Sequence, residues 1–87
     1  MKLFVITKEE MIDGEVNINV EVATKYEKAK KYFNDEIEKF KNDDIAKRHY
    51  DTEDFELEER YQTSYFVKSS CDDYYFQLDI DEKETID

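Results

Sequence analysis

The amino-acid sequence predicts a small α+β domain of the order ββαββ, in which one amphipathic helix packs on one face of an antiparallel sheet. Apolar and polar residues alternate in three segments and recur at helical spacing in a fourth. The chain has 87 residues, the length of one domain with a modest core. Hydrophobic types make up 39% of it, which is enough to fold despite the high charge. We therefore expect a single domain over residues 1–87.

A hairpin is predicted over residues 2–23. From Glu15 to Ala23 the chain alternates strictly, which is the period of a half-buried strand. The apolar side of this strand consists of Val16, Ile18, Val20 and Val22. Asp13-Gly14 suits a two-residue turn, because such a turn needs positive φ. With this turn, Val5 faces Val22 and Met11 faces Val16.

A helix is predicted from about residue 25 to 42. Thr24 and Glu27 match a capping box, in which the Thr side chain accepts a hydrogen bond from the backbone amide three residues on. The stripe that should lie on the sheet consists of Tyr26, Ala29, Phe33, Ile37 and Phe40. A ladder of alternating charges, interpreted as a solvated face, consists of Glu27, Lys31, Asp35, Lys39 and Asp43.

The remaining elements are an acidic connector over about 43–59 and a second hairpin over about 60–82. The connector is either a helical turn leading into a long loop or the acidic start of a third strand. The hairpin is predicted from two alternating runs separated by a turn at 69–73. The runs are Tyr61, Thr63, Tyr65 and Val67, and then Tyr74, Phe76, Leu78 and Ile80.

Acidity is the chemical signature of the chain. It has 24 Asp and Glu against 13 Lys and Arg, a formal net charge of −11. Charge of this sign disfavours nucleic acid and anionic membranes as direct ligands, because each phosphate meets like charge. We therefore expect a basic protein as the partner.

The compartment is predicted to be the cytoplasm of a bacterial cell. The single cysteine, Cys71, has no internal disulfide partner, which suits a reducing compartment. The apolar run from Leu3 to Ile6 is too short for a signal-peptide core or a membrane span. Abundant Lys, Ile, Asn, Tyr and Phe are typical of an AT-rich genome, such as that of a low-GC bacterium or its phage.

Catalytic and metal-binding motifs are not found in the sequence, so we predict no enzyme, no cofactor and no metal. His49 lies in polar sequence, and the acids after Cys71 disfavour a thiolate. Asp79-x-Asp81 begins like an EF-hand loop, but Glu84 stands where the turn glycine belongs. A loose divalent-cation site at Asp72 and Asp73, or a carboxylate-based enzyme, is the less favoured alternative.

The candidate partner-binding residues are carboxylates and one tyrosine. Residues i and i+2 of a strand share a face about 6.6 Å apart, so Asp79 and Asp81, with Glu21 on another strand, could form a row spaced like backbone phosphates. Tyr75 should lie beside them as an exposed recognition residue. The full predicted set is Asp51, Glu53, Asp54, Glu56, Glu58, Glu59, Asp72, Asp73, Tyr75, Asp79 and Asp81. The alternative is an acidic surface that serves solubility alone.

In size, charge, αβ layout and the acids between Asp51 and Glu59, the chain resembles the small acidic inhibitors of phages and mobile elements, namely anti-CRISPR proteins and DNA mimics. The resemblance implies a non-enzymatic inhibitor that occupies a basic nucleic-acid-binding site, such as the channel or PAM-reading arginines of a CRISPR effector. The second hypothesis is a small protein-interaction module that works through an exposed sheet or an edge strand.

Overall fold

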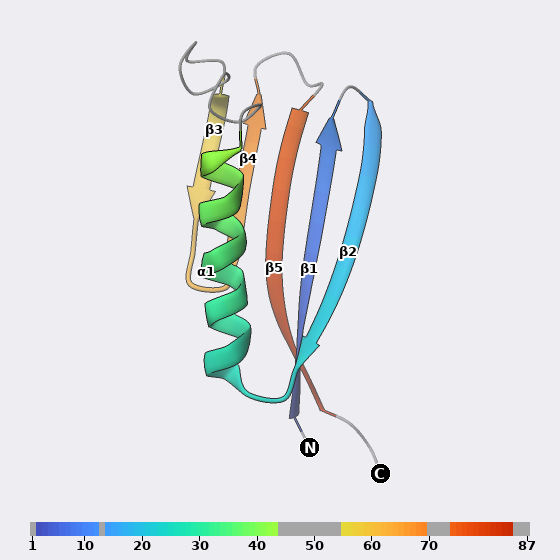
Figure 1. Ribbon diagram of the computed structural model, residues 1–87, viewed down its shortest axis with the longest axis vertical. Coiled ribbons are helices and arrows are strands. Elements are labelled where there is room, and N and C mark those ends of the chain that lie inside the picture. Colours follow the sequence, from blue (N-terminus) through green and yellow to red (C-terminus); the bar gives the residue numbers. More distant parts are fainter. Residues whose placement is uncertain (1, 13, 44–54, 70–73, 85–87) are drawn as a thin grey trace.

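An antiparallel sheet of five strands, with one helix lying across one of its faces, makes up the described part of the chain (Figure 1). The computed structural model describes residues 2–12, 14–43, 55–69 and 74–84. In chain order the elements are β1 (Lys2–Ile12), β2 (Glu15–Ala23), α1 (Tyr26–Asn42), β3 (Phe55–Arg60), β4 (Ser64–Ser69) and β5 (Tyr74–Glu84). The predicted α+β class is confirmed.

The strands lie in the order β2-β1-β5-β4-β3, so the first and last strands of the chain are neighbours in the middle of the sheet. The predicted hairpin register is confirmed, since Val5 pairs with Val22 and Met11 with Val16. Gly14 has φ of 84°, the backbone conformation for which glycine is suited in such a turn. β1 and β5 pair along their whole length, and this pairing joins the two ends of the chain.

Residues 55–60 form strand β3, as the second alternative for the acidic connector predicts, whereas the part of the connector at 44–54 lies outside the described residues. The described part therefore has one strand more than the ββαββ order predicts. The next strand, β4, begins at Ser64, and not at Tyr61 as the alternation suggested. Tyr61 is exposed, and its backbone N–H donates to the carbonyl oxygen of Ser64 at 2.7 Å, which closes the turn between β3 and β4.

Helix α1 is confirmed over Tyr26–Asn42, but the predicted capping box is wrong. The N-cap is Lys25, whose extended backbone has φ −127° and ψ 136°, and no side chain caps the helix there. The extended chain continues one residue past Thr24, so the helix starts too late for Thr24 to cap it. The apolar stripe is confirmed, since Tyr26 is half-buried and its other four members are fully buried.

The core lies between α1 and the middle of the sheet. Phe40 stacks on Phe76 with ring centroids 4.4 Å apart and meets Tyr65 edge-on at 6.2 Å. The fully or almost fully buried apolar residues are Ile6, Ala29, Phe33, Ile37, Phe40, Tyr65, Val67, Tyr74, Phe76, Leu78 and Ile80. Because β5 contributes four of them and β2 none, the helix-covered half of the sheet holds the fold together.

Candidate protein-binding surface

The face of the sheet opposite α1 has no covering element among the described residues, and we call it the open face. Neighbours along a strand point to opposite faces. Ile6 is buried beneath α1 and pairs with Glu21 and Ile80, so the residues on either side of each of these point to the open face. In β1, β2, β5 and β4 the open face carries Leu3, Val5, Thr7, Glu9, Met11, Val16, Ile18, Val20, Val22, Tyr75, Gln77, Asp79, Asp81, Lys83, Ser64, Phe66 and Lys68.

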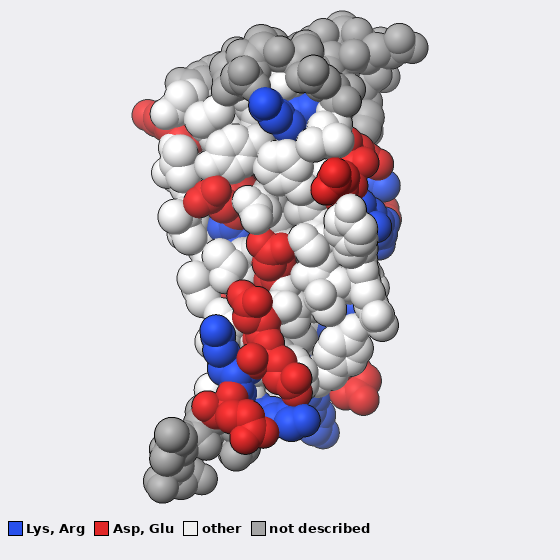
Figure 2. Space-filling model, turned by 180° about the vertical axis from the view of Figure 1, so that it is seen from behind, with Lys and Arg blue, Asp and Glu red and all other residues white. Residues whose placement is uncertain are grey.

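Three carboxylates of the open face, Glu9, Asp79 and Asp81, form what we call the carboxylate column. Residues that pair across neighbouring strands lie at the same level of the sheet, and residues two apart in a strand lie at successive levels of one face. Glu9 is at the level of its partner Gln77, Asp79 is at the next level and Asp81 at the one after. Successive levels on one face are separated by about 6.6 Å. Figure 2, which looks onto the open face, shows red carboxylates running down its middle with paler surface on both sides.

Hydrogen bonds hold two members of the carboxylate column in place. Asp79 is half-buried, and its Oδ1 accepts from the hydroxyl of Ser64 at 2.7 Å while its Oδ2 accepts from Nε2 of Gln77 at 3.0 Å. Oε2 of Glu9 accepts from the hydroxyl of Tyr75 at 2.9 Å. Side chains fixed in this way lose less conformational entropy when they bind a partner.

Tyr75 is half-buried beside the carboxylate column. Its ring centroid lies 6.3 Å from that of Phe66 on the neighbouring strand. The hydrogen bond to Glu9, together with partial desolvation, raises the pKa of Tyr75 above its ordinary value, because ionisation would break the bond and place two anions side by side. The hydroxyl of Tyr75 therefore stays protonated at neutral pH and donates a hydrogen bond to Glu9.

An exposed apolar stripe runs along β2, at the edge of the open face. We call it the β2 stripe, and it consists of Val16, Ile18, Val20 and Val22. These side chains are between 51% and 59% exposed, so the prediction of a half-buried strand is wrong. The register turns the stripe away from α1, and β2 has no described strand on its outer side. Four exposed β-branched side chains in a row on an edge strand are uncommon in a soluble domain, and such patches typically mark interaction sites.

The predicted binding residues are only partly brought together. Tyr75, Asp79 and Asp81 share the open face, and Glu59 joins them from β3 through its pairing with Phe66. Glu58 points to the other face, where its Oε2 accepts from the hydroxyl of Tyr65 at 3.2 Å. The side chain of Glu56, and all of Asp51, Glu53, Asp54, Asp72 and Asp73, lie outside the described residues.

One predicted member of the row is wrong and one member was missed. Glu21 pairs with Ile6 and so lies on the opposite face from Asp79 and Asp81. Glu9 occupies the place expected for Glu21. The predicted pairing of Val5 with Val22 indicates only that Glu9 shares a face with the apolar side of β2, and the pairing of β1 with β5 is needed to place Asp79 and Asp81 on that face.

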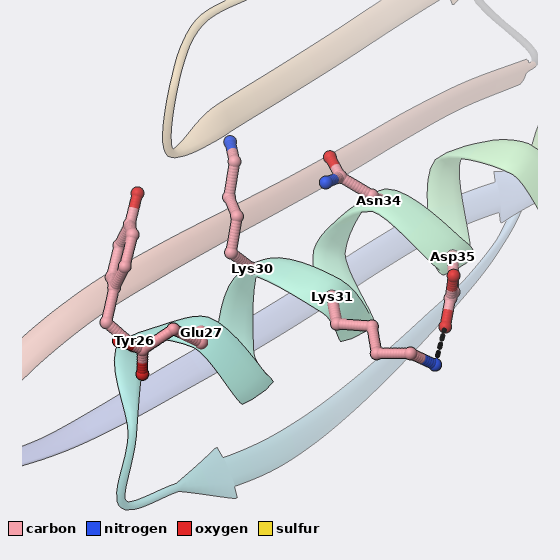
Figure 3. Close-up of a pocket in the computed structure, with 6 residues that line it drawn as sticks. All are labelled: Tyr26, Glu27, Lys30, Lys31, Asn34 and Asp35. Atoms are coloured by element: carbon pink, nitrogen blue, oxygen red, sulfur yellow. Dashed lines mark hydrogen bonds and ion pairs between the residues drawn. The ribbon is translucent and has the colours of Figure 1, made fainter.

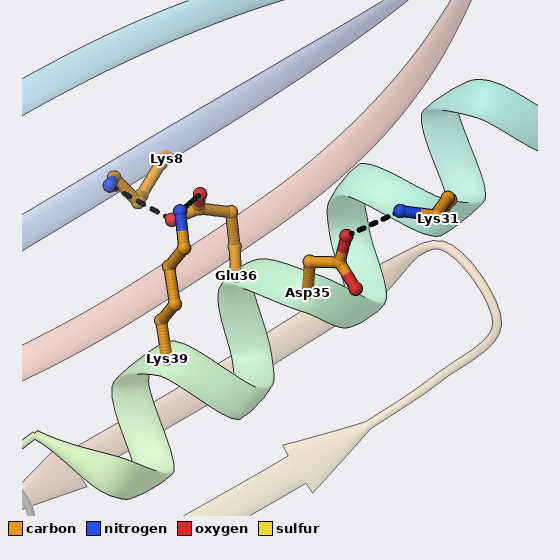
Figure 4. Close-up of polar contacts among 5 residues, drawn as sticks. All are labelled: Lys8, Lys31, Asp35, Glu36 and Lys39. Carbon is orange, nitrogen blue, oxygen red and sulfur yellow. Dashed lines mark hydrogen bonds and ion pairs between the residues drawn. The ribbon is translucent and has the colours of Figure 1, made fainter.

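A buried carboxylate on the helix side of the sheet was also missed. Glu36 is 7% exposed, and its two oxygens accept from Nζ of Lys8 at 3.1 Å and of Lys39 at 3.3 Å (Figure 4). A cavity of about 210 Å³ adjoins this cluster. Glu10 also lines the cavity, and burial raises its pKa, with Asp43 and Glu36 adding to the rise and Lys8 opposing it. The cluster anchors α1 to β1 at a place where β1 carries polar side chains.

A hollow of about 450 Å³ lies on the outer side of α1 and is lined by Tyr26, Glu27, Lys30, Lys31, Asn34 and Asp35 (Figure 3). All six come from one helix. Nζ of Lys30 extends from it to donate to the carbonyl oxygen of Gln62 and lies 4.5 Å from the Phe33 ring centroid. Lys31 is paired with Asp35 at 3.2 Å. Lys30, Lys31 and Asp35 have partners within the fold, so the hollow presents no convergent set of groups for a ligand.

Metal and membrane features were sought in the same residues. No group of three or more His, Cys, Asp or Glu in the described ranges is arranged to hold a metal ion. Within those ranges α1 is too short and too polar to cross a bilayer. Comparison with known proteins finds no matching family model, no matching curated protein and no matching solved structure.

Proposed function

We propose that the protein is a non-enzymatic acidic inhibitor that binds a basic, nucleic-acid-binding site of another protein through its open face. The observation that carries this proposal is the carboxylate column of Glu9, Asp79 and Asp81 on an uncovered sheet. Asp79 and Asp81 are about 6.6 Å apart along β5, and Glu9 lies diagonally from Asp79 on the neighbouring strand, so each carboxylate can meet a separate Lys or Arg of a site built for a phosphate backbone.

Electrostatics supports the proposal in two ways. A net charge of −11 steers a basic partner toward the protein and speeds association at low salt. The hydrogen bonds from Ser64, Gln77 and Tyr75 hold two of the carboxylates before the partner arrives. The attraction between such a column and a basic site is screened by salt, so the complex should weaken as the salt concentration rises.

The target class follows from the resemblance to anti-CRISPR proteins and DNA mimics. A CRISPR effector, or another defence nuclease in a bacterial cytoplasm, has Lys- and Arg-lined channels and PAM-reading arginines that this surface would occupy. The inhibitor would act by exclusion, because the site holds either the carboxylate column or the nucleic acid. No chemical step on a substrate is involved.

The β2 stripe favours a second candidate function. A protein-interaction module that works through the open sheet or through its β2 edge would use the apolar residues for affinity and the acids for solubility. Its complexes would resist salt, because apolar burial is not screened. Salt dependence therefore separates the two candidates.

The test is an affinity capture with three versions of the full chain. Tagged protein is incubated with lysate of a low-GC bacterium that expresses a CRISPR effector, washed at low and at high salt, and then challenged with DNA or RNA. The column variant is Glu9→Gln, Asp79→Asn and Asp81→Asn. The matched control removes three charges from exposed positions of α1 by Glu27→Gln, Asp35→Asn and Glu38→Gln.

The proposal expects the wild type and the control to retain a basic nucleic-acid-binding protein that is released by high salt and by its own nucleic acid. The column variant should lose that protein at a salt concentration at which the control keeps it. The purified target should also stop binding nucleic acid in a mobility-shift assay when the wild type is added. A salt-resistant partner that binds its nucleic acid undisturbed would refute the mimicry and support the interaction module.

A further inference from the structure

We infer that the element of the partner that docks on the open face is a basic amphipathic helix, with its apolar row on the β2 stripe and its Lys or Arg row on the carboxylate column. This inference rests on the proposed function and goes beyond it by naming the shape of the ligand. It starts from the arrangement of the two features side by side on one uncovered face.

The two features lie in parallel and at the same levels of the sheet. Val20 shares a level with Asp79 through Thr7, and Val22 shares the next level with Asp81 through Val5. At each of these levels a partner therefore meets an apolar side chain on β2 and a carboxylate on β5. A surface of this kind complements an element that carries an apolar row and a cationic row along its length.

The spacing between the rows favours a helix. β2 and β5 are separated by β1, so Asp79 and Asp81 lie about 9.6 Å from the β2 stripe, which is close to the 10–12 Å diameter of a helix with its side chains. Glu9, on β1, lies nearer to the stripe. The stripe from Val16 to Val22 extends over about 20 Å, the length of nearly four helical turns. Lysines at positions i, i+4 and i+8 of a helix rise about 6 Å each, which their long side chains can match to the carboxylate spacing.

A strand added to the free edge of β2 would use this surface less well. Such a strand lies in the plane of the sheet, three strand spacings or about 14 Å from β5. Its side chains would flank the β2 stripe without covering it, and its cations would lie too far from Asp79 and Asp81. Edge addition therefore leaves both features unexplained.

A second copy of the chain is also a poor occupant. Two open faces packed together would place carboxylate columns within one interface, where like charges repel. The outer side of α1 offers no apolar row, because its exposed positions are Glu27, Lys28, Lys31, Asp35, Glu38, Lys39 and Asn42. The complementary element must therefore come from another protein.

The experiment titrates the ¹⁵N-labelled full chain with a synthetic helical peptide of about 16 residues, and follows amide chemical shifts. The peptide carries a leucine row and, along one flank of it, lysines at i, i+4 and i+8. The matched peptide has the same composition, with the lysines moved to the side opposite the leucines. We expect shifts at Ile18, Val20, Asp79 and Asp81, and a Kd at least about tenfold lower for the first peptide than for the second.

Two variants of the chain locate the contacts. Ile18→Thr with Val20→Thr removes apolar surface from the β2 stripe and keeps good strand formers, so the fold is retained. Asp79→Asn with Asp81→Asn removes two charges from the carboxylate column. Each variant should weaken the first peptide by about tenfold or more, whereas Glu27→Gln with Glu38→Gln on α1 should leave its Kd within about twofold.

Equal binding of the two peptides, shifts confined to α1, or a dimer of the free chain that buries Val20 would overturn this inference. The proposed function has a separate readout. If the capture experiment yields a salt-sensitive target displaced by nucleic acid while the amphipathic peptide fails to bind, the mimicry stands and the helical ligand is wrong. If the peptide binds as expected but no captured target competes with nucleic acid, the docking mode stands and the mimicry is wrong.

Discussion

The same substitution at two strand positions, Val67→Ala and Val20→Ala, should have very different effects on stability. Val67 is 0% exposed beneath α1, whereas Val20 is 56% exposed on the open face. Removing two methyl groups from a fully buried site loses about 1.6 kcal/mol of transfer free energy. The cavity left behind adds about 1 kcal/mol, so Val67→Ala should lower the free energy of unfolding by about 2–3 kcal/mol. At Val20 less than half of the transfer term applies and no cavity forms, so the loss should be below about 1 kcal/mol.

The measurement is urea unfolding of both variants and the wild type, followed by circular dichroism and tyrosine fluorescence and analysed by linear extrapolation. A domain of this length has a total stability of roughly 4–13 kcal/mol, so a difference of about 2 kcal/mol between variants is well resolved. If Val20→Ala cost as much as Val67→Ala with an unchanged m-value, Val20 would be buried in solution. The assignment of the β2 stripe to an uncovered face would then be wrong.

Three further predictions concern the helix side of the molecule. Lys25→Ser should raise the free energy of unfolding by about 0.5–1 kcal/mol, because Lys25 is an N-cap without a side-chain hydrogen bond; a lower urea midpoint would contradict this. Lys8→Met should lower the free energy of unfolding by about 1–3 kcal/mol, because the buried Glu36 loses the less exposed of its two lysine partners. Adding Glu36→Leu should recover most of that loss. Additive effects of the two substitutions in a double-mutant cycle would contradict the coupling of Lys8 and Glu36. For Glu10, the folded protein binds its proton more tightly than the unfolded chain, so this group's contribution to stability falls as the pH rises from about 4.5 through the raised pKa. In thermal unfolding measured as a function of pH, Glu10→Gln should therefore gain stability relative to the wild type over that pH range and keep the gain above it; a difference between the two proteins that does not change with pH would contradict this.

Local periodicity was sufficient to predict the elements that carry the core. The stripe of α1 and the alternation of Tyr74, Phe76, Leu78 and Ile80 are repeats that do not depend on the rest of the chain. The register of the first hairpin also follows locally, because a two-residue turn leaves one way to pair its strands. The predicted cap of α1, Thr24, is one residue too early, because the backbone conformation of Lys25, which is extended, decides where the helix begins.

Only part of the carboxylate column, Asp79 and Asp81, could be predicted from the sequence. Asp79 and Asp81 are two residues apart in one strand, so their shared face is a local property. Their neighbour across the sheet is not local. Glu9 lies beside them and Glu21 does not, because β1 pairs with β5 and its register was settled by contacts between the two ends of the chain.

The sequence by itself determined that this protein has amphipathic strands, one amphipathic helix and a large excess of acid. Only the tertiary structure decided which side of each strand the helix covers. Alternation divides a strand into two sides, but it does not say which side meets α1. The pairing of β1 with β2 turns the apolar side of β2 away from α1, so that side stays exposed on the open face next to the carboxylates. The candidate binding surface exists because of that register.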